Sequence, residues 1–193
     1  MGLSLPGCFD IFGMGSEGTD SEEDDSQKPD SDLETIGVYD VEVVLEKSDC
    51  GQGSITIAPS LSFEATLSED EEQTAIFWDS GAGPKEGVWK DDGAAFAFGS
   101  SFVVDVRSPE TDDDWLPPCR IRRIDTVEGE FDSARDRSSF EGTMSFRYEA
   151  TEGSDCSDII GEPEYWGTVA VLGKLPCEAS YEVFGVEPPE DDQ

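Results

Sequence analysis

The chain has no histidine and no asparagine among its 193 residues. Without histidine it lacks the usual general base near neutral pH, the commonest transition-metal ligand and every Ser-His or Cys-His catalytic arrangement. Without asparagine it has no acceptor for N-glycosylation. The role of a base with a tuned pKa would then fall to a buried carboxylate, and we expect a protein that is not an enzyme and that uses no cofactor.

Basic residues are also scarce: 12 Lys and Arg stand against 46 Asp and Glu, a formal net charge of -34. This charge repels phosphate backbones, which argues against nucleic acid as a partner, and it repels anionic membrane surfaces. The acidity has two explanations, namely a salt-adapted proteome or an acidic surface protein of an ordinary bacterium. Five cysteines favour the second, because disulfides belong to oxidising compartments.

Long apolar runs are absent too, and the only apolar stretch before the main body, residues 1–14, is too short to cross a bilayer. Within it, Leu5-Pro6-Gly7-Cys8 resembles the lipobox at which bacterial lipoprotein precursors are lipidated on cysteine. We therefore expect a remnant signal segment at 1–14 with Cys8 as the lipidated residue, and a truncated signal sequence would explain the missing positive charge. The alternative is an apolar end with an incidental cysteine.

Residues 15–35 are almost entirely polar and mostly acidic, and residues 188–193 form a short acidic tail. Such segments cannot build a core, so we expect 15–35 to be a disordered linker that is extended by self-repulsion. A solvated tether after a lipid-bearing cysteine is what a surface lipoprotein requires. Membrane contact is accordingly expected only through a lipid on Cys8.

From residue 36 onward, apolar residues recur with period two: Tyr39, Val41 and Val43 share one face, with Asp40 and Glu42 on the other. This alternation is typical of half-buried β-strands. Short strands with frequent Gly and Asp turns indicate an antiparallel barrel or sandwich over 36–187. The other expected strands lie at 55–67, 75–78, 87–90, 94–107 with a break near Gly99, 120–126, 128–132, 140–150, 165–172 and 177–186.

The segments VEGEFDSARDRSSFEGTMSFRYEATEGSDC (127–156) and LPCEASYEVFG (175–185) resemble small extracytoplasmic lipoproteins of bacteria. The resemblance lies in strand rhythm and cysteine placement. It implies an all-β, antiparallel up-and-down, lipocalin-like barrel of about eight strands behind a lipobox and a linker. A two-sheet β-sandwich fits the same strands and is the alternative.

If Cys8 carries lipid, an even set remains, Cys50, Cys119, Cys156 and Cys177, and we expect two disulfides. The favoured pairing joins Cys156 to Cys177, which flank the strand around Tyr165, and Cys50 to Cys119. The alternative joins Cys50 to Cys177, at the first and last strands, and Cys119 to Cys156. A zinc site is disfavoured because the chain has neither a CxxC pair nor histidine.

Acidic runs occur at 20–25, 69–72, 110–114 and 190–192. The loop at 110–114 could gather oxygen ligands for Ca²⁺, but no run has EF-hand spacing. We interpret these runs as solvated faces and expect no metal. The basic residues gather at Arg120, Arg122 and Arg123, joined by Arg135 and Arg137. We expect them to offset the charge of carboxylates on neighbouring strands, and the alternative is that they bind an anionic ligand.

The predicted function is a lipid-anchored surface or periplasmic protein, monomeric, that acts as a binding or structural module. Its partner would be a small apolar ligand or a surface protein. The alternative is an extracellular hydrolase using calcium or paired carboxylates, for which two inward carboxylates in a deep cleft would be the sign. Carboxylates are instead expected on the outer face and in loops. The expected inner face comprises Val41, Val43, Phe63, Phe98, Phe146, Tyr148 and Val169.

Overall fold

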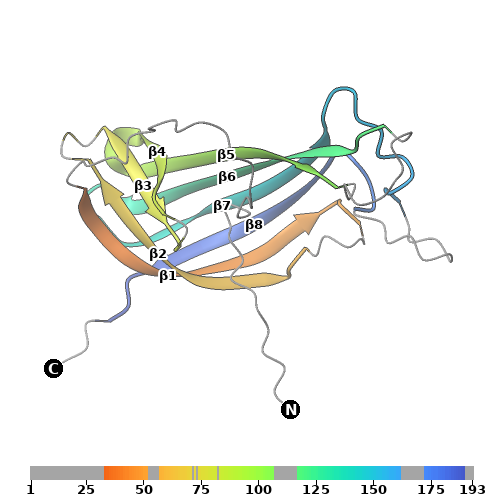
Figure 1. Cartoon of the computed structure of the whole chain (residues 1–193). Coiled ribbons are helices and arrows are strands. Elements are labelled where there is room, and N and C mark those ends of the chain that lie inside the picture. Colours follow the sequence, from red (N-terminus) through yellow and green to blue (C-terminus); the bar gives the residue numbers. More distant parts are fainter. Residues whose placement is uncertain are drawn as a thin grey trace, which may run out of the picture.

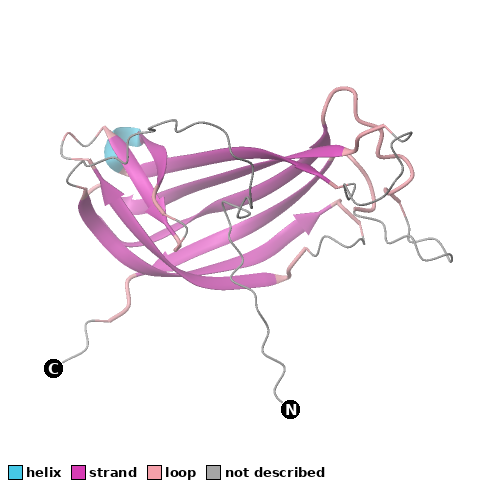
Figure 2. Ribbon diagram, viewed as in Figure 1, coloured by secondary structure: helices cyan, strands magenta, loops and turns pink. Residues whose placement is uncertain are grey.

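The computed structural model describes residues 33–51, 57–70, 72, 74–81, 83–106, 117–161 and 172–189. Eight antiparallel strands pair in chain order, and β8 pairs with β1 to close an up-and-down barrel (Figures 1 and 2). The expected barrel is confirmed over the two-sheet alternative. The strands are β1 (Glu34–Ser48), β2 (Ser60–Glu69), β3 (Ala75–Asp79), β4 (Lys85–Lys90), β5 (Ala95–Asp105), β6 (Arg120–Ser133), β7 (Asp136–Ala150) and β8 (Cys177–Val186), with a short 3₁₀ turn, η1, at Asp91–Gly93.

Some strand boundaries differ from expectation. Strands expected at 120–126 and 128–132 are one strand, β6, and β5 runs on through Gly99, which pairs with Thr126. β1 begins at Glu34, inside the expected linker. The segment 1–14, most of the linker and the strand expected at 165–172, apart from Leu172, lie outside the described residues. Among the described residues, no helix is both long enough and apolar enough to cross a bilayer.

One end of the barrel, which we call the aromatic end, lies at the β6–β7 turn and is filled with rings. Phe140 is buried at its centre, with its ring 5.2 Å from Tyr39, 5.3 Å from Phe96 and 5.9 Å from Phe131 between centroids. Inward positions with no side chain make room for these rings. A Cβ at Gly129 would collide with the ring of Phe96. Edge-to-face and tilted packing of this kind adds to the stability that burial provides.

The rim of the aromatic end is closed by Arg137. Its guanidinium lies 3.2 Å from a carboxylate oxygen of Glu69 and 4.7 Å from the ring centroid of Trp89. The hydroxyl of Tyr39 donates a 2.6 Å hydrogen bond to the Arg137 carbonyl. Burial, with a smaller contribution from the charge of Glu187, raises the pKa of Tyr39, while Arg137 opposes the rise. Tyr39 is therefore a neutral donor that ties β1 to β7.

The opposite half of the barrel has a shorter wall, because β3 and β4 are brief. β3 pairs with β2 only over 66–69, and β4 pairs with β5 only over 95–98. Among the described residues, 60–65 and 99–105 therefore have a strand partner on one side only. The inward-facing side chains of these two segments are only partly buried: Leu61, Phe63, Ser100, Phe102 and Val104.

Two disulfides lie at this half, which we call the disulfide end. Cys50 bonds to Cys177 and Cys119 bonds to Cys156. The favoured pairing is therefore wrong, and the alternative pairing is the one formed. Cys50 follows β1, and closure of the barrel places β1 beside β8, which begins at Cys177. Cys119 precedes β6 and Cys156 follows its neighbour β7. Two disulfides indicate an oxidising, extracytoplasmic environment.

Candidate functional site

The inner face of β6 carries a charged pair at the disulfide end. Strand alternation turns Arg123 and Asp125 inward, in line with the buried Ile121 and Val127. Arg123 Nε donates to Asp125 Oδ1 at 2.7 Å. The Asp125 side chain has no exposed surface, and that of Arg123 is 16% exposed. The expectation that all carboxylates lie outside or in loops is therefore wrong for Asp125 and also for Glu69, which is 7% exposed.

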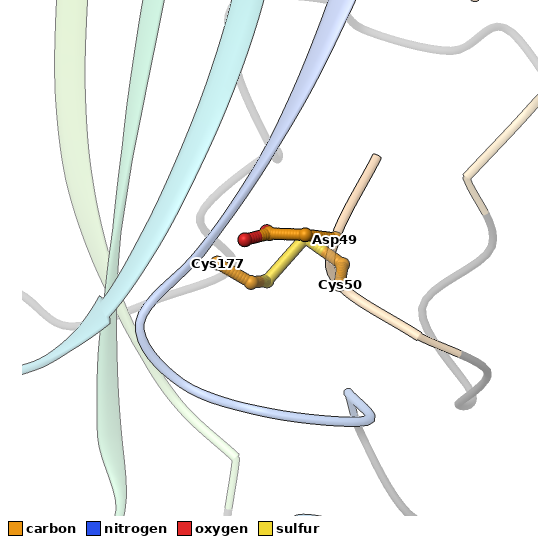
Figure 3. Close-up of side chains that lie close together, drawn as sticks. All are labelled: Asp49, Cys50 and Cys177. Atoms are coloured by element: carbon orange, nitrogen blue, oxygen red, sulfur yellow. A yellow bond between two sulfur atoms is a disulfide. The ribbon is translucent and has the colours of Figure 1, made fainter. Parts of the chain in front are cut away.

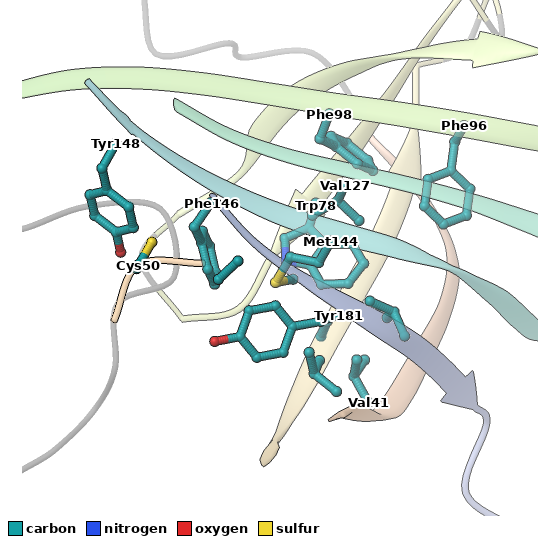
Figure 4. Packing of buried hydrophobic residues seen from close by; sticks show 14 of the residues in the cluster. Val41, Cys50, Trp78, Phe96, Phe98, Val127, Met144, Phe146, Tyr148 and Tyr181 are labelled. Carbon is teal, nitrogen blue, oxygen red and sulfur yellow. The ribbon is translucent and has the colours of Figure 1, made fainter. Parts of the chain in front are cut away.

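Aromatic rings fix the guanidinium of Arg123. It lies 4.4 Å from the ring centroid of Phe146 on β7 and 5.3 Å from that of Phe102 on β5. A guanidinium over an aromatic face is attracted by the ring quadrupole, and more strongly when water is excluded. The ring of Phe146 in turn packs edge-on against Tyr181 at 5.5 Å. Figure 4 shows Phe146 and Tyr148 from β7 and Tyr181 from β8 in the interior.

Burial sets the ionisation of this region. It raises the pKa of Asp125 to about 6, although the charge of Arg123 and its hydrogen bond both oppose the rise. It also raises the pKa of Tyr148 and Tyr181; Arg123 lowers both values, and Asp125 raises that of Tyr148. At neutral pH the pair is ionised and both phenols keep their protons. The region therefore holds balanced charge and neutral hydroxyls.

Two polar atoms on this inner face have no hydrogen-bond partner among the described residues. One is Asp125 Oδ2 and the other is Ser100 Oγ, and both are buried. Ser100 on β5 lies directly opposite Asp125 in the strand register, and Phe146 lies opposite on the β7 side. A buried polar atom without a partner costs about 1–3 kcal/mol. An acceptor and a hydroxyl therefore lie on neighbouring strands without partners.

Two other arginines of the basic group, Arg120 and Arg122, form ion pairs on the outer face of β6. Arg122 lies 3.5 Å from Glu149 and Arg120 lies 3.6 Å from Asp105, each directly across from its partner in the strand register. These exposed pairs confirm the expected offsetting of charge across strands. The same interpretation is wrong for Arg123, whose guanidinium faces the interior. Position parity counted back from Val127 and Phe131 would have placed it there.

A second cluster of ligand-type atoms lies at Asp49, Cys50 and Cys177, whose atoms fall within 4.8 Å of one another (Figure 3). The two sulfur atoms are joined in a disulfide, so neither offers a thiolate to a metal. Asp49 accepts hydrogen bonds from Lys174 Nζ at 2.6 Å and from the Glu178 N–H at 2.8 Å. The hydrogen bond from Lys174, followed by that from Glu178, lowers the pKa of Asp49. This cluster joins β1 to β8.

Of the acidic runs, 69–72 is partly described. Asp70 accepts hydrogen bonds from the backbone N–H groups of Thr74 at 2.6 Å and Ala75 at 3.0 Å, and so shapes the β2–β3 turn. The runs at 20–25, 110–114 and 190–192 lie outside the described residues, as do Cys8 and Val169. The other expected inner-face residues do line the interior, with Phe63 partly buried and the rest buried: Val41, Val43, Phe98, Phe146 and Tyr148.

No protein-family model, curated protein or solved structure matches this chain. Function is therefore inferred from the geometry of the barrel. The Arg123–Asp125 pair with Ser100 combines unpartnered buried polar atoms with neighbouring aromatic rings and a shortened wall.

Proposed function

We propose that this protein is an extracytoplasmic, monomeric binding module that holds a small, mainly apolar ligand in the disulfide end of its barrel. A lipid on Cys8 would anchor it, as in the bacterial lipoproteins that it resembles. The supporting observation is the contrast within the inner face. Rings pack against each other at the aromatic end, whereas the disulfide end combines partly buried rings with a few convergent polar groups. Ligand sites in proteins have this second composition.

The alternative, a hydrolase with paired carboxylates, is less well supported. The inward carboxylates Asp125 and Glu69 each form an ion pair with an arginine. Arg137, the partner of Glu69, lies at the β6–β7 turn, so about 20 Å of strand separates the two carboxylates, at roughly 3.3 Å per residue. Glycosidase carboxylates lie about 5–10 Å apart. The calcium version of this alternative rests on 110–114, outside the described residues.

A neutral fluorescent probe, N-phenyl-1-naphthylamine, tests binding by the oxidised full chain. We expect saturable, one-to-one fluorescence enhancement, because the probe is apolar and is not repelled by the protein's negative charge. Phe102→Trp adds bulk on the inner face and should weaken binding at least tenfold. Val103→Trp is the matched control, since Val103 is the next residue on β5 and is 49% exposed on the outer wall. Binding that does not saturate, or that both variants weaken equally, would contradict the proposal.

Anchoring is tested separately from binding. The gene is expressed from its complete reading frame in a bacterium that is fed a fatty-acid analogue. The wild-type protein should carry the label and the Cys8→Ser variant should not. Equal labelling of the two proteins, or no labelling of either, would rule out Cys8 as the anchor while leaving the binding proposal intact.

A further inference from the structure

We propose that the ligand carries a neutral hydroxyl group, which lies between Asp125 and Ser100 on the inner face of β5 and β6. The inference rests on the proposed binding function and names the chemical class of the ligand. It would be an apolar or aromatic alcohol or phenol. Its body would lie against the partly buried side chains of the shortened wall.

The first support is that only one of the two Asp125 carboxylate oxygens has a hydrogen-bond partner. Oδ1 accepts the hydrogen bond from Arg123 at 2.7 Å, whereas Oδ2 is buried without a partner. The side chain is fully buried, so bulk water does not solvate Oδ2. A carboxylate oxygen in this position requires a donor. A donor group on a bound ligand would satisfy Oδ2, because no described residue does so.

The second support is Ser100, whose buried Oγ also lacks a partner and which pairs with Asp125 in the strand register. A ligand hydroxyl can donate to Asp125 Oδ2 and at the same time accept from the Ser100 O–H. A carboxylate can only accept, so it cannot satisfy Asp125 Oδ2. A hydroxyl can satisfy both atoms; an ammonium can also do so by donating to both oxygens, and charge distinguishes these two groups.

Charge balance points to the same class of ligand. Arg123 and Asp125 cancel each other's charge inside the barrel. An ammonium on the ligand would be a second cation near Arg123, and a carboxylate would be a second anion near Asp125. A buried charge without a counterion is costly. A neutral hydroxyl avoids this cost.

Near the pair, the shortened wall carries apolar side chains that are only partly buried, and the apolar body of a ligand would lie against them. Beyond Phe98, β5 has no partner on its β4 side among the described residues, and Phe102 faces inward from this stretch. Across the shortened wall, Leu61 and Phe63 face inward from β2 and are also only partly buried. Apolar side chains that face inward without full burial gain when a ligand covers them.

Two probes that differ in one methyl group test the inference: 2-naphthol, which has a hydroxyl, and 2-methoxynaphthalene, which cannot donate. Calorimetric titration of the oxidised full chain is carried out at pH ~7.5, well above the raised pKa of Asp125. It should show that 2-naphthol binds at least tenfold more tightly than 2-methoxynaphthalene. Ser100→Ala should weaken the binding of 2-naphthol severalfold and leave that of 2-methoxynaphthalene unchanged. This variant removes a hydroxyl with no partner in the described structure, so the fold should persist.

A double variant, Arg123→Leu with Asp125→Leu, replaces the buried pair with apolar side chains, an exchange that proteins often tolerate. It should bind both naphthalenes with equal affinity. The matched control removes an exposed pair, Lys90→Gln with Glu128→Gln, whose charged atoms lie 2.6 Å apart on the outer wall. That control should keep the tenfold preference for 2-naphthol.

The outcomes separate this inference from the binding function. Equal affinity of the wild type for both probes would overturn the hydroxyl inference and leave the binding function standing. No binding of either probe would overturn both and would indicate a buried water between Asp125 and Ser100. Tighter binding of protonated 2-naphthylmethylamine than of 2-naphthol would replace the hydroxyl by an ammonium and also overturn the inference.

Discussion

The two ends of this barrel use the same residue types for different purposes. At the aromatic end, Phe140 contacts other rings, and the hydroxyl of Tyr39 is paired with a backbone carbonyl. At the disulfide end, Phe146 contacts the guanidinium of Arg123, and the neighbouring Asp125 has an oxygen without a partner. Rings packed against rings stabilise the fold. Rings beside a carboxylate oxygen without a partner leave a hydrogen bond that a ligand can supply.

The aromatic end also has unpartnered buried atoms, Trp89 Nε1 and Arg137 Nε. Both are donors, and both belong to rim side chains that are only partly buried. The face of the Trp89 ring is already covered by the Arg137 guanidinium at 4.7 Å. At the disulfide end, by contrast, an acceptor and a hydroxyl lie opposite each other on the inner face. This difference makes the disulfide end the better candidate for binding.

The largest expected effect concerns the disulfides, because both lie at the end with the shorter wall. Cys50 and Cys177 are separated by 127 residues and Cys119 and Cys156 by 37. On the chain-entropy account, converting each pair to serine should cost about 5 and about 4 kcal/mol of the free energy of unfolding, respectively. Urea unfolding of the two double variants measures both. A larger loss for the shorter loop would show that the disulfides act mainly on the folded barrel.

The next effect compares one phenylalanine from each end. Phe140 is 2% exposed among other rings, so Phe140→Ala should lower the free energy of unfolding by about 3–5 kcal/mol. Phe102 is only partly buried, so Phe102→Ala should cost under about 2 kcal/mol. Thermal and urea unfolding check both variants. Equal losses would mean that the disulfide end is packed as tightly as the aromatic end.

A smaller effect is the pH dependence due to Asp125, which faces Arg123 and lies near Tyr148 and Tyr181. Its pKa rises from 3.8 in the unfolded chain to about 6 in the fold. Between these two pH values the folded state therefore binds more protons than the unfolded chain. The contribution of Asp125 to the free energy of unfolding falls as the pH rises from about 4 to about 6. The loss is about 3 kcal/mol when complete.

Asp125→Asn removes this titration but keeps all the surface carboxylates that also titrate. The free energy of unfolding of Asp125→Asn minus that of the wild type should therefore increase across this pH range and be flat above it. Paired unfolding curves in a pH series measure the difference. A difference that is independent of pH would show that the Asp125 carboxyl has an ordinary pKa and is reached by water.

The barrel could be predicted from the sequence because its signal is local. Alternation at Tyr39, Val41 and Val43 defines an inner face without knowledge of any other strand. Disulfide pairing depends on closure, since only the pairing of β1 with β8 brings Cys50 beside Cys177. Chain order alone therefore left two pairings open.

The candidate site could not be predicted because it breaks the pattern on which the strand prediction rests. Arg123 and Asp125 occupy inward positions where apolar residues are expected, while Ile124 between them faces outward. Ser100 gives no signal either, because serine is common on both faces of strands. Their proximity follows from the β5–β6 register, which only the folded barrel sets.

The most direct test is to map the binding of 2-naphthol by NMR chemical-shift changes on the isotope-labelled, oxidised chain. Binding at the disulfide end predicts saturable shifts that are largest at Ser100, Phe102, Asp125 and Phe146, with little change at Phe96, Phe131 and Phe140. The largest shifts at those three aromatic-end residues, or no saturable shifts at all, would contradict the assignment of binding to one end and packing to the other.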